Sequence, residues 1–309
     1  MKSISTYFLW IFLGVVLILP LCTGTYICYV LCIMSISVLC ATGLNLVTGF
    51  AGQISLGQSG FVAIGAYACA LFMTRVGLGF WMALPLGGLM AAGVGFLIAF
   101  PFTRLRGIYL ALVTFGFGAI VETIVIRWDS LTRGPDGMQV PFPQFGPLAL
   151  NSDVRMFYLI FGITVILVTV ARNLVHSRVG RAFVSVRDSE MAARAMGIDI
   201  TRHKIIAFVL SAFYGGIAGG LYASLVQFIS PDAFSVLESV IYLTMIVVGG
   251  LGSIGGSIVG GILLSLLPEI LREFKEFQEL LFGGILILSL IFLPNGLVGL
   301  WDKIWKPAE

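Results

Sequence analysis

Long runs of apolar residues, separated by short polar stretches, make up most of this chain. A helix needs roughly 20 apolar residues to cross a bilayer, with a range of about 17–25. Ten runs come near that length, and the pattern predicts helices at Tyr7–Leu21, Tyr26–Val47, Gln58–Thr74, Phe80–Phe100, Ile108–Ile126, Val154–Ala171, Ile205–Val226, Leu237–Val248, Ile254–Leu267 and Leu280–Leu293. Two or three of them are short enough to be tilted, interrupted or re-entrant. We therefore expect an all-α, polytopic transmembrane bundle of about 8–10 spans, with residues 1–309 forming one domain.

The composition excludes an ordinary soluble protein. Hydrophobic residues make up 59% of the chain and charged residues 11%, against about 25% charged in globular domains. The net charge of +3 is too small for a nucleic-acid footprint, so no nucleic acid is expected as a partner. All five cysteines lie in apolar runs and are interpreted as buried small side chains. The first run has no A-x-A-like cleavage site and is interpreted as an uncleaved first helix.

The stretch Arg172–Lys204 is the one long polar run. It carries seven cations against three acids, and loops this basic stay on the cytoplasmic side of a membrane. Counting spans outward then predicts that both termini are cytoplasmic. This topology puts twelve Lys and Arg residues inside and six outside, in agreement with the positive-inside rule.

A short helix of about three turns is expected within this stretch. Ser185 or Ser189 can cap its start, Glu190 can pair with Arg194 four residues on, and Gly197 suits a left-handed helix end. Asp199 or Thr201 can cap the next helix. One side of the short helix is small and apolar, comprising Ala192, Ala193, Ala195 and Met196. Two interpretations remain open: an amphipathic helix on anionic lipid, or a docking knob for a soluble partner.

Two glycine-rich segments interrupt the hydropathy, at residues 43–60 and 249–261. Irregular backbone at membrane depth needs cover from protein or a water-filled cavity, and a pair of such segments points to a transport path between repeats. Close packing through small residues is the alternative. The polar residues favour the path, which we predict is bordered by Asn45, Thr48, Gln53, Ser55, Gln58 and Ser253. Whether the repeats are inverted or parallel stays open.

Motifs for chemistry are absent from the sequence. It has no P-loop, no HExxH, no GxSxG and no metal-ligand spacing, so no catalytic residue, metal or cofactor is expected. Ionisable groups avoid the middles of the spans. Glu122 is the main exception, and both histidines belong to the basic stretch. An ion-coupled carrier is therefore disfavoured, a membrane enzyme or structural subunit has no motif behind it, and the energy for transport should come from a separate chain.

The segment from Trp128 to Asp153 contains the turn-rich sequence TRGPDG. It is expected to form a structured loop outside the membrane. A binding surface for an extracytoplasmic partner and a plain connector are equally compatible with it.

Four blocks of the sequence resemble one family. They are GLNLVTGFAGQISLGQSGFVAIGAYACALF (43–72), VGRAFVSVRDSEMAARAMGIDITRHKIIAFVLSAFYGGIAGGLYA (179–223), IVVGGLGSIGGSIVGG (246–261) and FLPNGLVGL (292–300). The chain resembles the LivM-type permeases of branched-chain amino acid ABC importers, and the likeness extends to the TRGPDG motif. It covers nearly everything after the first run.

The resemblance assigns a role to the basic stretch. ABC permeases carry an EAA-type loop that docks on the ATPase, and this chain has Glu190, Ala192, Ala193 and Gly197, with one extra residue between Glu and the first Ala. The implied coupling residues are Ser189, Glu190, Ala192, Ala193, Arg194, Met196 and Gly197.

The resemblance also implies partners and cargo. The partners would be a second, LivH-type permease as a heterodimer, two cytoplasmic ATP-binding subunits, an extracytoplasmic binding protein and the lipid of the bacterial inner membrane. The implied substrates are leucine, isoleucine and valine. Other amino acids, urea and short amides are alternatives carried by close relatives, and related permeases move simple sugars.

Overall fold

The computed structural model describes residues 20, 24–105, 107–145, 148–149, 152–270, 283–284, 287 and 296–297. The predicted helices at 7–21 and 280–293 lie almost entirely outside the described residues. The other eight predicted helices are present: α2 (Thr25–Asn45), α3 (Gln58–Thr74), α4 (Phe80–Phe102), α5 (Ile108–Arg127), α7 (Asp153–His176), α10 (Ile200–Val226), α11 (Val236–Gly249) and α12 (Ile254–Ile270). Among the described residues, six helices are long and apolar enough to cross a membrane, and α3 and α12 are shorter apolar helices. This confirms the predicted polytopic helical bundle.

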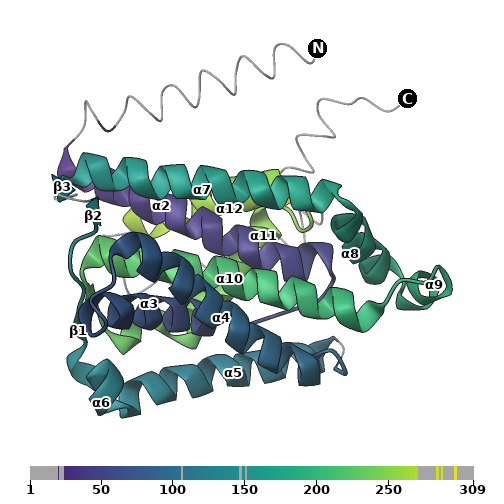
Figure 1. Cartoon of the computed structure of the whole chain (residues 1–309). Coiled ribbons are helices and arrows are strands. Elements are labelled where there is room, and N and C mark those ends of the chain that lie inside the picture. The colour runs from purple at the N-terminus through teal and green to yellow at the C-terminus, as the bar shows by residue number, and fades with distance from the viewer. Residues whose placement is uncertain are drawn as a thin grey trace, which may run out of the picture.

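Short elements cap the two ends of the bundle. One end carries α6 (Asp129–Thr132), the 3-10 helices η2 (Gly134–Asp136) and η3 (Pro231–Phe234), and the strands β1 (Met138–Gln139), β2 (Gln144–Phe145), β3 (Leu148–Ala149) and β4 (Phe228–Ile229). β1 pairs antiparallel with β4 through Met138 and Ile229, and β2 pairs with β3. We call this the strand end. The opposite end carries α8 (Arg178–Asp188) and α9 (Glu190–Ala195), and we call it the loop end (Figure 1).

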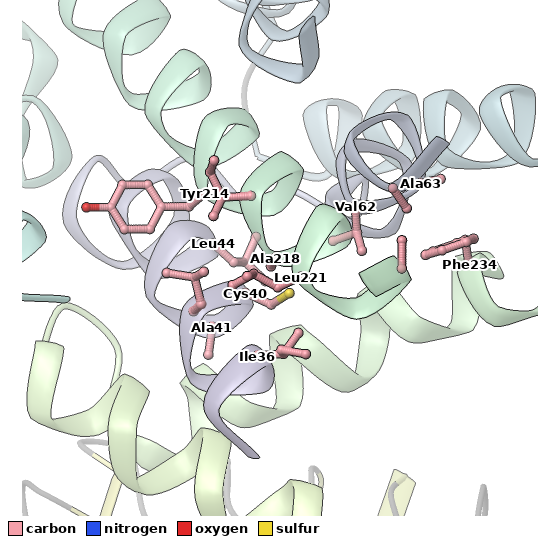
Figure 2. Packing of buried hydrophobic residues seen from close by; sticks show 14 of the residues in the cluster. Ile36, Cys40, Ala41, Leu44, Val62, Ala63, Tyr214, Ala218, Leu221 and Phe234 are labelled. Atoms are coloured by element: carbon pink, nitrogen blue, oxygen red, sulfur yellow. The ribbon is translucent and has the colours of Figure 1, made fainter. Parts of the chain in front are cut away.

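Helix α10 is the centre of the bundle and packs against α2, α3 and α4. Its contact with α3 relies on glycine, because a side chain on Gly65 would collide with the backbone of Gly216, and one on Gly219 with the Val62 carbonyl. Small residues let membrane helices approach closely in this way. Larger side chains fill the adjoining layer, where Tyr214 and Leu221 of α10 lie beside Leu44 of α2 (Figure 2).

Several hydroxyl groups within the helices bond to their own helix. Ser35, Thr42 and Ser224 each donate to the carbonyl four residues earlier, at 2.8, 2.7 and 2.9 Å. Such bonds let hydroxyls sit in an apolar interior without unpaired groups. The cysteines behave as expected where they are described: Cys28, Cys32, Cys40 and Cys69 are free and buried.

Candidate translocation and coupling site

Asn45 joins the two glycine-rich segments. Its side chain is fully buried, and its Nδ2 donates to the Ser257 hydroxyl at 2.7 Å and to the Ser253 carbonyl at 2.9 Å. Its Oδ1 accepts from the Gly252 amide at 2.9 Å. A buried amide makes such bonds only where its partners are fixed. The two glycine-rich segments, which the sequence analysis placed beside one path, are therefore in direct contact. Asn45 and Ser253 lie next to each other at this contact.

The chain between α2 and α3 is irregular. After α2 it forms a π-helical turn, η1 (Leu46–Phe50), and residues 51–57 form no regular element. Thr48 holds the turn: its hydroxyl donates to the Gln53 carbonyl at 3.1 Å and accepts from the Ser55 amide at 3.4 Å. The Gln53 Oε1 atom is buried and has no hydrogen-bond partner among the described residues. Thr48, Gln53 and Ser55 thus form one local cluster.

The start of α3 is tied to three other helices. Gln58 is fully buried and exchanges hydrogen bonds with Ser211 of α10, its Oε1 accepting from the serine hydroxyl at 3.0 Å. Ser59 accepts from the Ser239 hydroxyl of α11 at 2.8 Å, and Leu56 N–H donates to Thr114 of α5 at 2.9 Å. Gln58 therefore points to α10 and away from the Thr48 cluster. Sequence reasoning did not find Ser211, Ser239 or Thr114, because only the fold brings these distant residues to the segment.

The glycines of the second segment serve packing and turning. A side chain on Gly249 would collide with the Gly256 carbonyl, and one on Gly260 with the Met245 carbonyl, so α11 and α12 touch through bare backbone. Gly250 and Gly252 between them have φ of 134° and 71°, which disfavours other residues. In this segment, close packing through small residues accounts for the glycines. Ser253 precedes α12 and caps its start, because its hydroxyl accepts from the Gly256 amide at 3.2 Å.

Arg187 of α8 lies across both irregular segments. Its Nη1 donates to the Gly49 carbonyl of η1 at 3.0 Å, and its Nε pairs with Asp188 at 3.0 Å. An added Cβ on Gly52 would lie 2.7 Å from Arg187 Cγ, and one on Gly252 would lie 2.8 Å from Nη1. The two glycines make room for the guanidinium. Arg187 thus connects the loop end to both breaks, a role that the sequence alone does not reveal.

The basic stretch folds into two helices rather than one. Ser189 has extended backbone and caps α9 by accepting from the Ala192 amide at 3.2 Å. This break separates the 11-residue α8 from the 6-residue α9, so the expected single helix of about three turns is wrong. Ser185 lies inside α8 and caps nothing. The predicted left-handed Gly197 is confirmed at φ 79°, and Asp199 caps α10 by accepting from the Arg202 amide at 3.0 Å.

The faces of α9 also differ from expectation. Ala193 is only 3% exposed and packs on Val186 and Ile200, because α9 folds back onto α8 and the start of α10. Ala192 and Ala195 face outward. The large apolar groups on the outside are Met191 and Met196, at 85% and 82% exposed. Ala193 is therefore not part of the exposed apolar side that was predicted for this helix.

Glu190 forms an ion pair with Lys204, in place of the predicted pairing with Arg194, which lies on the exposed surface. The carboxylate lies 2.7 Å from the Lys204 ammonium, which is 1% exposed. This pair ties α9 to the N-terminal part of α10. A separate groove of about 450 Å³ between α8 and α10 is lined in part by basic side chains, including Arg178, Arg181 and Arg202.

The strand end has its own fixed contacts. Thr132 of the TRGPDG motif is buried, and its hydroxyl donates to the Val125 carbonyl of α5 at 2.7 Å. Glu122, the main ionisable residue that the sequence places within a span, accepts from the Val236 amide at 3.2 Å. It therefore holds the start of α11. The motif loop is thus structured, as expected.

Comparisons with known proteins agree with this architecture. Residues 26–290 match the family described as the permease component of branched-chain amino acid transport systems. The LivM permease protein of a high-affinity branched-chain amino acid transport system in Salmonella typhimurium is 38% identical over 287 residues, covering 85% of this chain and 68% of the relative. Its Escherichia coli K12 counterpart is 39% identical with the same coverage. The LivH permease protein of E. coli K12 is 25% identical over 84% of this chain and 90% of its own length.

No solved structure matches the chain significantly. The family match spans most of the sequence, and the likeness to LivM proteins exceeds the likeness to the LivH protein. The chain therefore belongs to the family of permease components of branched-chain amino acid ABC transport systems.

Proposed function

We propose that this chain translocates branched-chain amino acids across the bacterial cytoplasmic membrane, as one of two permease subunits of an ATP-driven importer. The observation that carries this proposal is the 38–39% identity to LivM permeases over most of the chain. The helical bundle and the absence of a nucleotide-binding motif fit a permease that relies on other subunits for ATP hydrolysis.

The path is proposed to run beside the irregular segments. Asn45 and Ser253 meet at the two helix breaks, Thr48, Gln53 and Ser55 lie in the irregular segment after α2, and Gln58 begins α3 and bonds Ser211. Non-helical backbone at membrane depth is tolerated only beside protein or a water-filled cavity. The unpartnered Gln53 Oε1 supports this placement, because a buried acceptor normally has a hydrogen-bond partner. All six side chains would border the path. Most of them would do so by making the hydrogen bonds that fix the positions of the helices and turns around it.

Coupling to two ATP-binding subunits is proposed to occur through α9. The helix projects at the loop end, where Met191 and Met196 offer exposed apolar surface. Ser189, Ala192, Arg194 and Gly197 complete this surface, whereas Glu190 and Ala193 fix the helix from within. A flexible methionine side chain adapts readily to a protein cleft. Arg187 would transmit movement of α8 and α9 to the helix breaks.

The loop end would face the cytoplasm and the strand end the exterior. This orientation rests on the basic residues of 172–204 and leaves the strand end for an extracytoplasmic binding protein. Both chain termini would be cytoplasmic. A LivH-type permease would form the second half of the membrane unit.

Reconstitution tests the proposal. The chain should be purified with a LivH-type permease, two ATP-binding subunits and the binding protein, and placed in liposomes. We expect ATP-dependent leucine uptake by the full assembly and none by this chain alone. Uptake by the single chain with ATP, or an assembly that carries urea or an amide but no branched-chain amino acid, would contradict the proposal.

A further inference from the structure

A cavity of about 370 Å³ lies at the strand end, away from the polar segments just described. It is lined by residues of α2, α3, α10, η3, α11 and α12, and none of the six predicted path residues is among them. Ile36, Val62 and Phe234 form part of its wall and are visible in Figure 2. Its volume falls within the range of about 300–1,000 Å³ that is usual for small-molecule sites.

One carboxylate in this cavity is not explained by the fold. Glu238 lies in the first turn of α11, within the apolar span Pro231–Gly249, and its side chain is partly buried in the cavity lining. Among the described residues, no cation lies within ion-pair distance of it, whereas Glu122 caps α11 nearby. A carboxylate at membrane depth is costly to keep, and such groups mark sites for ions or substrates.

The rest of the lining supplies the other features of an amino acid site. Tyr29, Tyr222 and Tyr242 also line the cavity; aromatic rings attract cations, and a tyrosine hydroxyl can donate to a carboxylate. Phe234 holds the Tyr222 ring edge-on, with centroids 5.8 Å apart. Ile33, Ile241 and Leu264 provide apolar surface for an aliphatic side chain.

We propose that this cavity is a holding site for a zwitterionic amino acid with an aliphatic side chain, and that Glu238 accepts its α-ammonium group. The proposal rests on the proposed function and adds a place and a recognition chemistry to it. The Glu238 carboxylate in the lining repels a second carboxylate, so the cavity disfavours amino acids with acidic side chains. Substrate released at the strand end would bind here before it reaches the helix breaks.

The test replaces the carboxylate by an amide of nearly the same shape. In the reconstituted five-chain importer, Glu238→Gln should lower leucine uptake at least tenfold, with unchanged binding of leucine to the extracytoplasmic binding protein. Its thermal unfolding temperature should equal or exceed that of wild type, because an unpaired carboxylate in an apolar setting does not stabilise the fold. Asp232→Asn is the matched control: Asp232 is an exposed acid of η3 at the same end and lies outside the cavity lining, so uptake should stay at the wild-type rate.

Three outcomes would overturn the inference: normal uptake by Glu238→Gln, a lowered unfolding temperature with poor assembly, or an equal loss from Asp232→Asn. The second would show that the carboxylate holds the fold. A failure of the proposed function is distinct, because it would appear as a wild-type assembly that takes up no branched-chain amino acid.

Discussion

At the scale of single residues, the charged groups differ in what holds them. Lys204 is buried at the base of α10 and has the Glu190 carboxylate 2.7 Å away. Arg187 and Asp188 form a pair of similar length, but their side chains are 38% and 62% exposed. Burial removes water from the first pair and leaves it around the second. The two pairs should therefore respond very differently to the loss of one partner.

Lys204→Met and Glu190→Gln should each destabilise the protein. Removing one member of a buried pair strands the other and typically costs about 3–5 kcal/mol; because Glu190 is partly exposed, we expect the lower part of that range for Lys204→Met. The double variant should recover most of the loss, since no uncompensated charge remains. Asp188→Asn, which removes the acid of the exposed pair, should change stability by no more than about 1 kcal/mol. Unfolding of the purified variants in detergent measures all four. Additive losses in the double variant would contradict a direct Glu190–Lys204 interaction.

At the scale of elements, the helix breaks organise the molecule. α2 ends in a π-helical turn before α3 begins, and α11 and α12 meet at a glycine turn. Asn45 bonds one break to the other, and Arg187 reaches across both from α8. We propose that a movement of α8 would reach both breaks through the Arg187 side chain.

Arg187→Met should uncouple ATP hydrolysis from uptake while the importer still assembles. Methionine keeps much of the aliphatic stem but cannot donate to the Gly49 carbonyl. We expect leucine uptake per ATP hydrolysed to fall clearly, while hydrolysis itself continues. Arg181→Met is the control, because Arg181 Nη1 bonds the His176 carbonyl within the loop end itself. Equal coupling ratios for both variants and wild type would remove Arg187 from the mechanism.

The α9 surface gives a second prediction for elements. Met196→Asp puts a charge on the exposed face, so it should weaken binding of the ATP-binding subunits by roughly ten- to a hundredfold in a pull-down. Gly197→Val should do similar damage, because valine resists the φ of 79°. Ala193→Trp would act differently, since Ala193 is buried against Val186 and Ile200 and overpacking costs about 1–3 kcal/mol of stability.

Arg178→Ala, outside α9, is the control and should leave binding nearly unchanged. Wild-type binding by both Met196→Asp and Gly197→Val would show that α9 is only a lipid-surface helix.

The sequence predicted the positions of the helices more accurately than the contacts between them. Apolar run length located α3 at its observed bounds and α4, α5 and α10 within a few residues, because a span must be long and apolar wherever it packs. Capping chemistry located Ser189, Gly197 and Asp199 for the same local reason. The partners of Gln58 and Glu190 lie 153 and 14 residues away, and no local rule selects among the many hydroxyls or the several cations. Glu238 drew no attention because only the fold surrounds it with a cavity.

At the scale of the whole molecule, the two ends are chemically different. The loop end collects the cations of α8, α9 and the start of α10, with a basic groove between them. The strand end carries the β1–β4 pair, the TRGPDG motif and the cavity with two carboxylates. Positive groups are retained on the cytoplasmic side during insertion. The asymmetry of the folded molecule therefore points the same way as the residue count along the chain.

The orientation can be tested by thiol labelling in intact cells. A cysteine at Asp136, exposed at the strand end, should react with a membrane-impermeant maleimide, and one at Ser189, exposed at the loop end, should react only after the membrane is opened. Cys28, Cys32, Cys40 and Cys69 are buried and should contribute little background. Because Ser189 also caps α9, its loss can cost about 0.5–2 kcal/mol of stability, so the uptake of each labelled variant should be checked. Labelling at Ser189 but not at Asp136 in sealed cells would reverse the topology. It would place α9 outside, where no ATP-binding subunit could reach it, and would turn the Glu238 cavity into an exit site rather than an entry site.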